Sequence, residues 1–263
     1  MKNWLEMTAA ALGRGIEDGS IDPVTLTETY LAAIQAHPLK DRIYARVTAD
    51  RARAEAAAAA ARARAGLRLS PLDGVPISWK DLFDTAGCAT EAGTALLKDR
   101  IPEADAEVLR NATAAGLVCL GKTHLSELAF SGLGVNPITA TPPCVNDAEA
   151  APGGSSSGAA ASVAFGLPAA ALGSDTGGSV RFDTAGPMTR SVEDAALLLA
   201  ALEGGKPADL QASDLSNARF GLLETIALDD LDDVIRGAFD ASVGKLRAAG
   251  AEIIPLDVPI LSD

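Results

Sequence analysis

The sequence predicts an α/β fold in which a central β-sheet is covered by helices on both faces. Short apolar runs of strand length alternate with segments whose apolar residues recur at intervals of three and four, a pattern typical of sheet-and-helix sandwiches. The chain has 263 residues, of which 48% are hydrophobic, so it is long enough to bury a full core. Because there is no internal repeat and no clear linker, residues 1–263 are expected to form a single domain.

Three helices are expected to open the chain. Residues 3–16 and 24–36 repeat apolar positions at helical spacing, and Asp22-Pro23 is a start signal for the second of these helices. Residues 48–65 are rich in alanine, arginine and glutamate and are followed by Gly66, which indicates a helix with a solvated face.

Strands and helices are expected to alternate in the rest of the chain. Strands are predicted at 74–79, 117–120 and 169–172, with helices at 105–115, 125–130 and 159–165. A further strand, helix, strand unit is predicted from 220–223, 231–249 and 252–256.

Composition argues against several functional classes. The formal net charge of -13 argues against direct nucleic-acid binding, because phosphate neutralisation needs clustered lysine and arginine. Cys88, Cys119 and Cys144 are too few and too scattered for a disulfide framework or a four-cysteine zinc site, which favours a reducing cytoplasm. Neither a signal peptide nor an apolar run of membrane-spanning length is recognised, so we expect no membrane association.

Two glycine-flanked serine segments carry the chemical signal. Residues 152–158 read PGGSSSG, and residues 173–181 read GSDTGGSVR. Glycine neighbours permit unusual backbone conformations, so the pair suggests a hydroxyl nucleophile and a hydroxyl relay. The first segment is followed by the helix-forming residues 159–165, whose N-terminus is expected to point its partial positive charge at the site. A flexible linker and a tight turn are the structural alternatives for the two segments.

A lysine upstream supplies a candidate base. Residues 73–81 read DGVPISWKD, so Lys80 closes a short apolar run. An apolar surrounding makes a lysine give up its proton more readily. Two serines and this lysine can form a triad without histidine, whereas the structural alternative for Lys80 is an ordinary surface lysine.

These motifs, in this order, closely resemble the amidase signature family. The segments 121–127 (GKTHLSE) and 183–194 also resemble family segments, so the resemblance runs from about residue 20 to residue 263. It implies the amidase signature fold, with a central mixed β-sheet. It implies neither a cofactor nor a metal ion.

The resemblance also implies roles for individual residues. Ser179 would be the nucleophile, Ser155 the relay serine that follows a cis peptide bond, and Lys80 the base. The expected oxyanion donors are the backbone N–H groups of Thr176, Gly177, Gly178 and Ser179. Supporting roles fall to Gly154, Ser156, Ser157, Ser174, Asp175 and Arg181, of which Asp175 and Arg181 would pair to brace the loop.

The implied activity is hydrolysis of a carbon–nitrogen bond through an acyl-enzyme. The expected ligand is a small-molecule carboxamide, aryl amide or carbamate, and a homodimer is left open as the assembly. Two alternatives remain. One is the glutamine-hydrolysing subunit of a transamidation complex, and the other is a shortened, inactive amidase-like protein that serves as a binding module.

Two further patterns have weaker functional interpretations. Residues 116–123 (GLVCLGKT) formally match a phosphate-binding loop, but the residues between the glycines are those of a strand. His124 and Glu127 lie one helical turn apart, but further metal ligands are lacking, so His124 is interpreted as a packed residue at a helix start.

The sequence also departs from the family pattern. Only Phe182 separates Arg181 from Asp183, where family members carry a longer segment, and family members continue past the equivalent of Asp263. The chain is therefore expected to lack an internal block after Arg181 and a C-terminal part.

Overall fold

The computed structural model describes residues 3–175, 184–210, 215–224 and 228–258. The chain divides into two units, Met1–Ala208 and Asp209–Asp263. All of the motif residues discussed above belong to the first unit.

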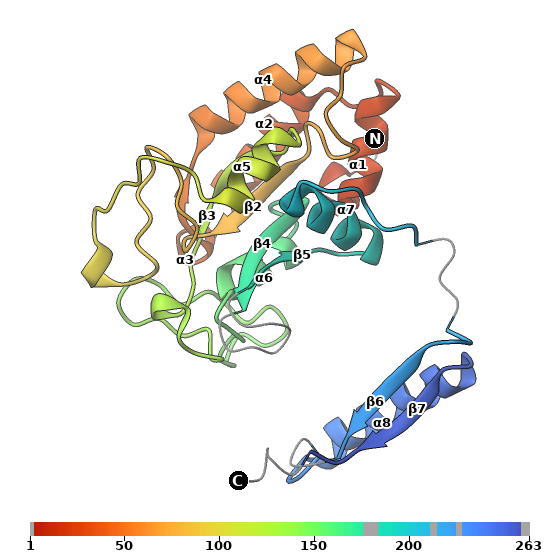
Figure 1. The fold of residues 1–263 in the computed structure, drawn as a ribbon. Coiled ribbons are helices and arrows are strands. Elements are labelled where there is room, and N and C mark those ends of the chain that lie inside the picture. The colour runs from red at the N-terminus through yellow and green to blue at the C-terminus, as the bar shows by residue number, and fades with distance from the viewer. Residues whose placement is uncertain (1–2, 176–183, 211–214, 225–227, 259–263) are drawn as a thin grey trace. The chain divides into compact units, whose positions relative to one another are not determined.

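A five-stranded mixed sheet forms the centre of the first unit (Figure 1). Its strands, in the spatial order β1-β3-β2-β4-β5, are β1 (Tyr44–Val47), β3 (Val118–Thr123), β2 (Pro76–Lys80), β4 (Ala170–Asp175) and β5 (Thr184–Met188). The three central strands are parallel, and the two edge strands run antiparallel to their neighbours. The predicted α/β fold with a central mixed sheet is confirmed.

Helices cover both faces of this sheet, as predicted (Figure 1). On one face, α4 (Ala49–Ala65) places the guanidinium of Arg51 5.2 Å from the ring centre of Trp79. On the other face, α6 (Ser157–Ala164) follows the loop that contacts Lys80. The remaining α-helices of this unit are α1 (Ala9–Glu17), α2 (Pro23–Ala36), α3 (Lys40–Ile43), α5 (Glu107–Ala114) and α7 (Val192–Glu203).

Local sequence signals explain the helix boundaries that were predicted well. Asp22 caps α2 by accepting the N–H of Thr25 at 2.9 Å, and Pro23 occupies the first helical position. Gly66 ends α4 in the left-handed conformation, with a φ of 68° that glycine adopts at little cost. The five residues of β2 are all buried, which explains their continuous apolar character up to Lys80.

The helix predicted over residues 3–16 is interrupted. A 3₁₀ turn at Trp4–Glu6 is followed by α1, which begins only at Ala9 after the cap residue Thr8. The carboxylate of Asp194 accepts the N–H groups of Ala9 at 3.0 Å and Ala10 at 2.7 Å. This distant acceptor fixes the start of α1, and no local window of sequence contains it.

The helix predicted over residues 125–130 is also wrong. Only a 3₁₀ turn forms at Glu127–Ala129, and Leu128 has a positive φ of 52°. The amide of Leu128 donates to the carbonyl of Ala92 at 2.9 Å, and that of Ser126 donates to Ser155 at 3.2 Å. These tertiary hydrogen bonds replace the helical ones. The elements α3, β1, β5 and α7 were not predicted.

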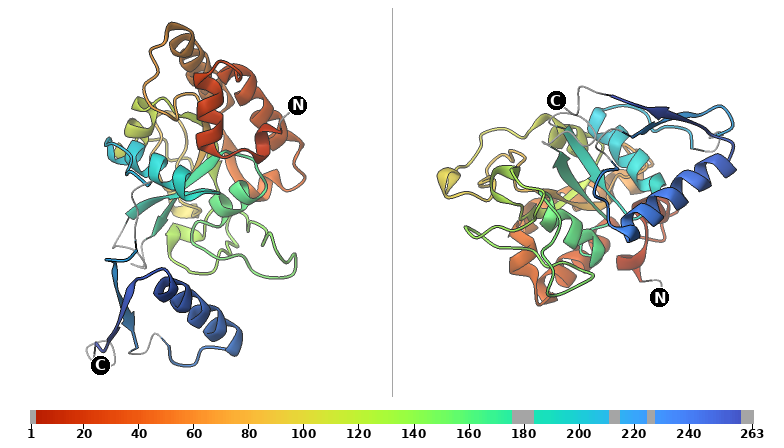
Figure 2. Two further views of the ribbon diagram at one scale, coloured as in Figure 1. Left: turned by 90° about the vertical axis from the view of Figure 1, so that its right-hand side faces the viewer. Right: turned by 90° about the horizontal axis from the view of Figure 1, so that it is seen from below.

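The second unit is the strand, helix, strand unit predicted from the sequence. It contains β6 (Arg219–Leu223), α8 (Asp233–Ala248) and β7 (Glu252–Leu256). The two strands pair in parallel from Arg219 opposite Glu252 to Leu223 opposite Leu256, and α8, blue in Figure 2, lies along them. None of the described helices in either unit is long and apolar enough to cross a membrane.

Candidate active site

The candidate site lies where the three parallel strands end. Lys80 is the last residue of β2, Thr123 the last residue of β3, and Asp175 the last residue of β4. Carboxyl ends of parallel strands meet at one edge of a sheet, and this edge commonly holds the ligand in open α/β sheets. The sheet therefore brings together motifs that are far apart in the sequence.

Lys80 joins two of the serine-bearing segments. Its Nζ donates to Ser155 Oγ and to Ser174 Oγ, each at 2.7 Å, and its side chain is fully buried. Ser155 comes from the loop before α6, and Ser174 comes from β4. The ordinary surface lysine considered for this position is excluded.

The surroundings of Lys80 favour its neutral form. Burial lowers the pKa of Lys80 from 10.5 to about 8, while the carboxylate of Asp175 acts in the opposite direction. A pKa near neutrality is what a general base needs, because the amine must lose its proton before it can accept another. Lys80 is thus chemically suited to take a proton from a hydroxyl.

The loop that carries Ser155 is held by backbone contacts. The peptide bond between Gly154 and Ser155 is cis, and the N–H of Gly154 donates to the carbonyl of Gly132 at 2.8 Å. A Cβ at Gly154 would lie 2.8 Å from the backbone nitrogen of Gly134, which is closer than real contacts allow. Glycine at 154 is therefore required by the close approach of the 132–134 segment.

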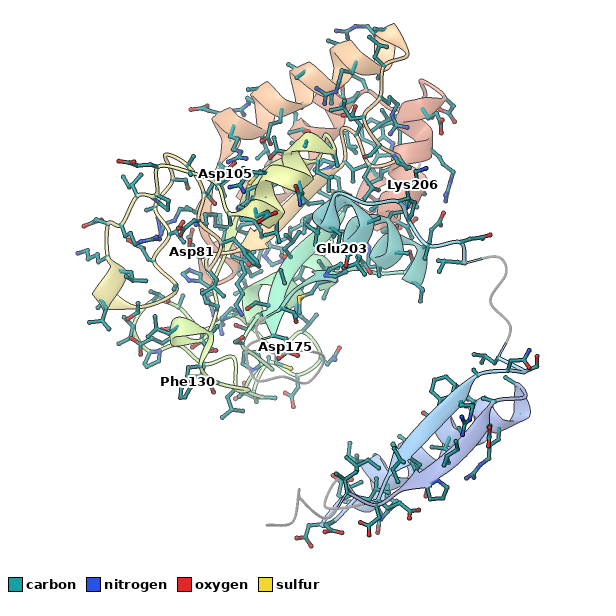
Figure 3. The ribbon with its side chains drawn as sticks, in the orientation of Figure 1. Asp81, Asp105, Phe130, Asp175, Glu203 and Lys206 are labelled. Carbon is teal, nitrogen blue, oxygen red and sulfur yellow. The ribbon has the colours of Figure 1, made fainter. Side chains whose placement is uncertain are left out.

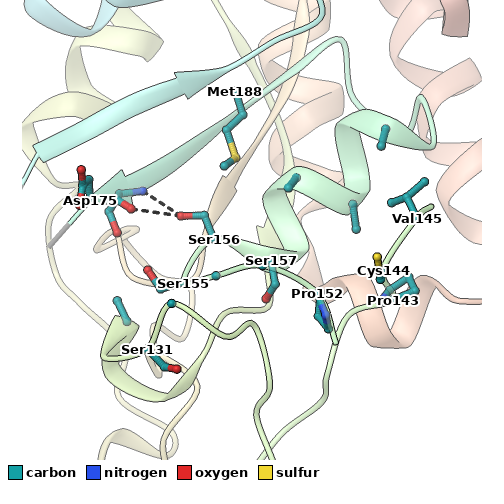
Figure 4. A pocket seen from close by; sticks show the side chains of 18 of the residues that line it. Ser131, Pro143, Cys144, Val145, Pro152, Ser155, Ser156, Ser157, Asp175 and Met188 are labelled. Atoms are coloured by element: carbon teal, nitrogen blue, oxygen red, sulfur yellow. Dashed lines mark hydrogen bonds between the residues drawn. The ribbon is translucent and has the colours of Figure 1, made fainter. Parts of the chain in front are cut away.

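Ser156 ties this loop to β4. Its Oγ accepts the N–H of Ser174 at 3.1 Å and donates to the carbonyl of the same residue at 3.3 Å (Figure 4). Ser156 therefore fixes the backbone of Ser174, and Ser174 in turn contacts Lys80. The helix α6 begins at the next residue, Ser157, so its N-terminus adjoins the site.

A pocket of about 1060 Å³ opens beside Ser155 (Figure 4). The hydroxyl of Ser157 is buried, lines the pocket and has no hydrogen-bond partner among the described residues. Asp175, half-buried, also lines it. The apolar part of the wall is formed by Ala129, Phe130, Pro143, Val145, Pro152, Ala160, Ala161, Ala164 and Met188. Such a wall suits an uncharged group of a small ligand.

Several predicted site residues lie outside the described part of the chain. These are the proposed nucleophile Ser179, the oxyanion residues Thr176, Gly177 and Gly178, and the supporting residue Arg181. Their roles stay predictions. Of the expected site, the described residues bring together Lys80, Gly154, Ser155, Ser156, Ser157, Ser174 and Asp175.

The two weaker motifs have structural roles. Residues 118–123 form β3, as their apolar character predicted, and a phosphate-binding loop at these positions is excluded. His124 is buried after the end of β3, not at a helix start, and its backbone N–H and carbonyl bond to Ile43 and Gly158. Glu127 accepts a hydrogen bond from Thr94 at 2.6 Å.

The sequence interpretation missed the partner of Asp81. Lys122, in β3, is completely buried and lies 2.8 Å from the carboxylate of Asp81, the residue that follows Lys80. The only sequence signal was a lysine inside an otherwise apolar strand, which had been absorbed into the motif at 116–123.

A mixed sheet with a buried lysine on a serine of a glycine-rich loop defines the class as an α/β serine–lysine hydrolase. The chain belongs to the amidase family, whose model matches residues 25–182 and 182–263. The match is divided at residue 182, where the sequence predicted a missing internal block.

Known proteins support this assignment. The chain is 36% identical over 291 aligned positions to a subunit of the glutamyl-tRNA(Gln) amidotransferase of Anaeromyxobacter dehalogenans, with 94% of this chain and 59% of the relative covered. An amidase crystal structure is 32% identical with a TM-score of 0.81, covering 96% of this chain and 64% of that one. The peptide amidase of Stenotrophomonas maltophilia is 30% identical with a TM-score of 0.79, covering 96% and 62%. The chain thus spans about three fifths of the length of these relatives.

Proposed function

We propose that this protein is an amidohydrolase in which Ser179 is the nucleophile, Ser155 the proton relay and Lys80 the base. The observation that carries the proposal is the 2.7 Å contact between the buried Lys80 amine and Ser155 Oγ. No histidine contacts Ser155 among the described residues, so the lysine is the group placed to act as the base. Membership of the amidase family supports the same reaction type.

The proton path follows from the order of the three groups. Neutral Lys80 takes the proton of the Ser155 hydroxyl while Ser155 takes that of Ser179, whose oxygen attacks the amide carbonyl carbon. The carbon–nitrogen bond then breaks, and the departing nitrogen receives a proton from Ser155, which is replenished by the Lys80 ammonium. Water attacks the resulting ester by the same path and releases the acid and free Ser179.

The substrate class is a small linear carboxamide, an aryl amide or a carbamate. The apolar wall next to Ser155 suits an uncharged acyl or aryl group. The unpartnered hydroxyl of Ser157 offers one polar contact in the same pocket. Hydrolysis of carbamates would make the enzyme a urethanase.

Glutamine hydrolysis within a transamidation complex is the second candidate. Its support is the 36% identity to an amidotransferase component, whose name describes work on glutamyl-tRNA(Gln). Such a protein would need partner subunits to pass ammonia to its acceptor. Glutaminase activity that rises when a co-purifying partner is added would favour this candidate over a free-standing amidase.

Covalent labelling tests the proposed nucleophile. We expect a fluorophosphonate probe to label the folded wild-type protein and to fail on Ser179→Ala, which should also lose at least about 1000-fold in amide hydrolysis. The control is Ser242→Ala, an exposed serine on α8, which should be labelled and active like wild type. Full hydrolysis by Ser179→Ala would refute the mechanism. An unlabelled but folded wild-type protein would favour the inactive binding module.

A further inference from the structure

Four charged side chains gather behind the end of β2, on the side of the sheet away from Ser155. Lys122 lies 2.8 Å from Asp81, while Arg46 lies 2.6 Å from Glu91 and 3.8 Å from Asp81. Lys122 and Asp81 are 0% and 2% exposed, and the other two side chains are about a quarter exposed or less. We call these four residues the charge cluster; Asp81 is labelled in Figure 3.

The charge cluster is fixed to the strand end that presents Lys80. The N–H of Asp81 donates to the carbonyl of Thr123, and its carbonyl accepts the N–H of Ala92, both at 2.9 Å. Its carboxylate accepts the N–H of Glu91 at 3.2 Å. Asp81 therefore joins β2, β3 and the loop at 89–92, and Lys80 is the residue immediately before it.

Lys122 completes this arrangement from β3. Its amine donates to the carbonyl of Ala89 at 3.1 Å and to the hydroxyl of Thr90. The contact with Asp81 Oδ1 lacks hydrogen-bond geometry, so the two residues are paired by charge. Trp79 is the residue opposite Lys122 and Thr123 is opposite Lys80, which puts the two lysines on opposite faces of the sheet.

The charges of the cluster sum to zero. Two cations and two anions leave no net charge at a buried position about 10 Å from the Lys80 amine, a spacing expected for neighbouring side chains on opposite faces of a strand. At that distance and an effective dielectric of about 20, one uncompensated charge would move a lysine pKa by about one unit. A charge balance at this position therefore matters to the base.

We propose that the charge cluster is a positioning unit that holds the end of β2 and, through its electrical neutrality, sets how readily the Lys80 amine loses its proton. The inference rests on the proposed role of Lys80 as the base. Burial already lowers the pKa of Lys80, and Asp175 on β4 opposes that effect from the site itself. The cluster keeps a second uncompensated charge from acting on the amine through the sheet.

Other titratable groups adjoin the cluster. Burial lowers the pKa of Lys122, and Asp81 and Arg46 act in opposite directions on the pKa of the buried His124. The remaining groups whose charges interact with Lys122 are Cys88 and Asp84, and Glu91 also accepts the N–H of Asp99. The variants below leave these neighbours outside the cluster unchanged.

Substitutions that remove one charge of each sign provide the test. We expect Lys122→Met to raise the pKa of Lys80 by about half a unit to one unit, because Asp81 is then uncompensated. Asp81→Asn should lower the pKa by a similar amount, because Lys122 then acts alone. The double variant, which is neutral again, should return within about 0.3 unit of wild type.

The measurement is NMR titration of protein labelled with [ε-¹³C]lysine, with the Lys80 signal assigned by its loss in Lys80→Met. The control is Glu28→Gln, which removes one charge from the exposed Arg53 pair and should not shift Lys80. If Lys122→Met does not fold, Arg46→Gln replaces it, because it also removes one cation of the cluster and should raise the pKa of Lys80.

Shifts of the same sign on removing a cation and on removing an anion, or no shift in either case, would overturn the proposal and leave the cluster a purely structural element. Because the NMR readout does not use activity, it still applies if Ser179→Ala remains active and the proposed mechanism fails. If the mechanism holds, the pH profile of kcat/KM should move with the NMR pKa in each variant.

Discussion

At Lys80, burial and hydrogen bonding act on the same amine. The side chain is fully buried, yet two hydroxyls lie 2.7 Å from its nitrogen, so the amine is desolvated without being left unpartnered. Burial lowers its pKa to about 8. The protein therefore holds a base near neutrality at a position that costs stability, as is common at functional sites.

This cost can be measured by removing the charge. We expect Lys80→Met to raise the free energy of unfolding at pH 7 by about 1 to 3 kcal/mol, less than the full pKa shift implies because the contacts with Ser155 and Ser174 are lost. The folded pKa of about 8 lies below the ordinary value of 10.5, so the unfolded chain binds more protons between these values. The penalty is full below about pH 8 and disappears as the pH rises through 10.5.

Urea denaturation at pH 7 and at about pH 10.5, the ordinary lysine pKa, checks this expectation. The stability difference between Lys80→Met and wild type should be present at the lower pH and small at the higher one. The exposed Lys98→Met provides the control and should match wild type at both. A variant that is less stable than wild type at pH 7 would show that the two hydroxyl contacts outweigh the cost of burial.

At the scale of elements, the first helix depends on a residue far away in the sequence. Asp194, at the start of α7, is fully buried, and each of its carboxylate oxygens accepts one N–H of the first turn of α1. A carboxylate at a helix N-terminus satisfies orphan donors and matches the partial positive charge there. This contact joins the first and last helices of the first unit.

Replacing Asp194 should therefore be costly. We expect Asp194→Ala to lower the free energy of unfolding by about 2 to 4 kcal/mol, because two buried N–H groups lose their acceptor. The neighbouring Glu193 is the matched control, since its ion pair with Arg14 is about half exposed on both sides. Glu193→Ala should cost less than about 1 kcal/mol. Similar losses in the two variants, measured by urea denaturation, would contradict this role of Asp194.

The same elements show what sequence patterns could predict. The strands β2, β3 and β4 and the helices α2, α4 and α6 follow from local periodicity and capping residues such as Asp22 and Gly66. The helix predicted over 125–130 failed because Ser126 and Leu128 bond to Ser155 and Ala92, which no local window contains. The contact between Lys80 and Ser155 was expected from the family resemblance, whereas Ser174 had been given only a supporting role and Lys122 none.

At the scale of the whole molecule, the apolar core belongs to the first unit. The main buried cluster runs from Ala9 to Leu202 and contains no described residue of the second unit. The second unit closes its own parallel strand pair, and α8 has no buried residue among those described. The sequence suggested a single domain because no composition change marks residues 208 and 209, and the division reflects where contacts form.

A chain that ends at Ala208 should consequently fold on its own. We expect cooperative thermal unfolding with a midpoint within about 5 °C of the full chain, because the core lost is small. Both tryptophans, Trp4 and Trp79, lie in the first unit, so their fluorescence reports its unfolding in the long and short chains alike. A chain that ends at Met188 is the control and should not fold, since it lacks α7 and with it Leu198 and Leu202 of the core. A non-cooperative or much lower transition for residues 1–208 would mean that the first unit needs the second, and would support the single domain that the sequence suggested.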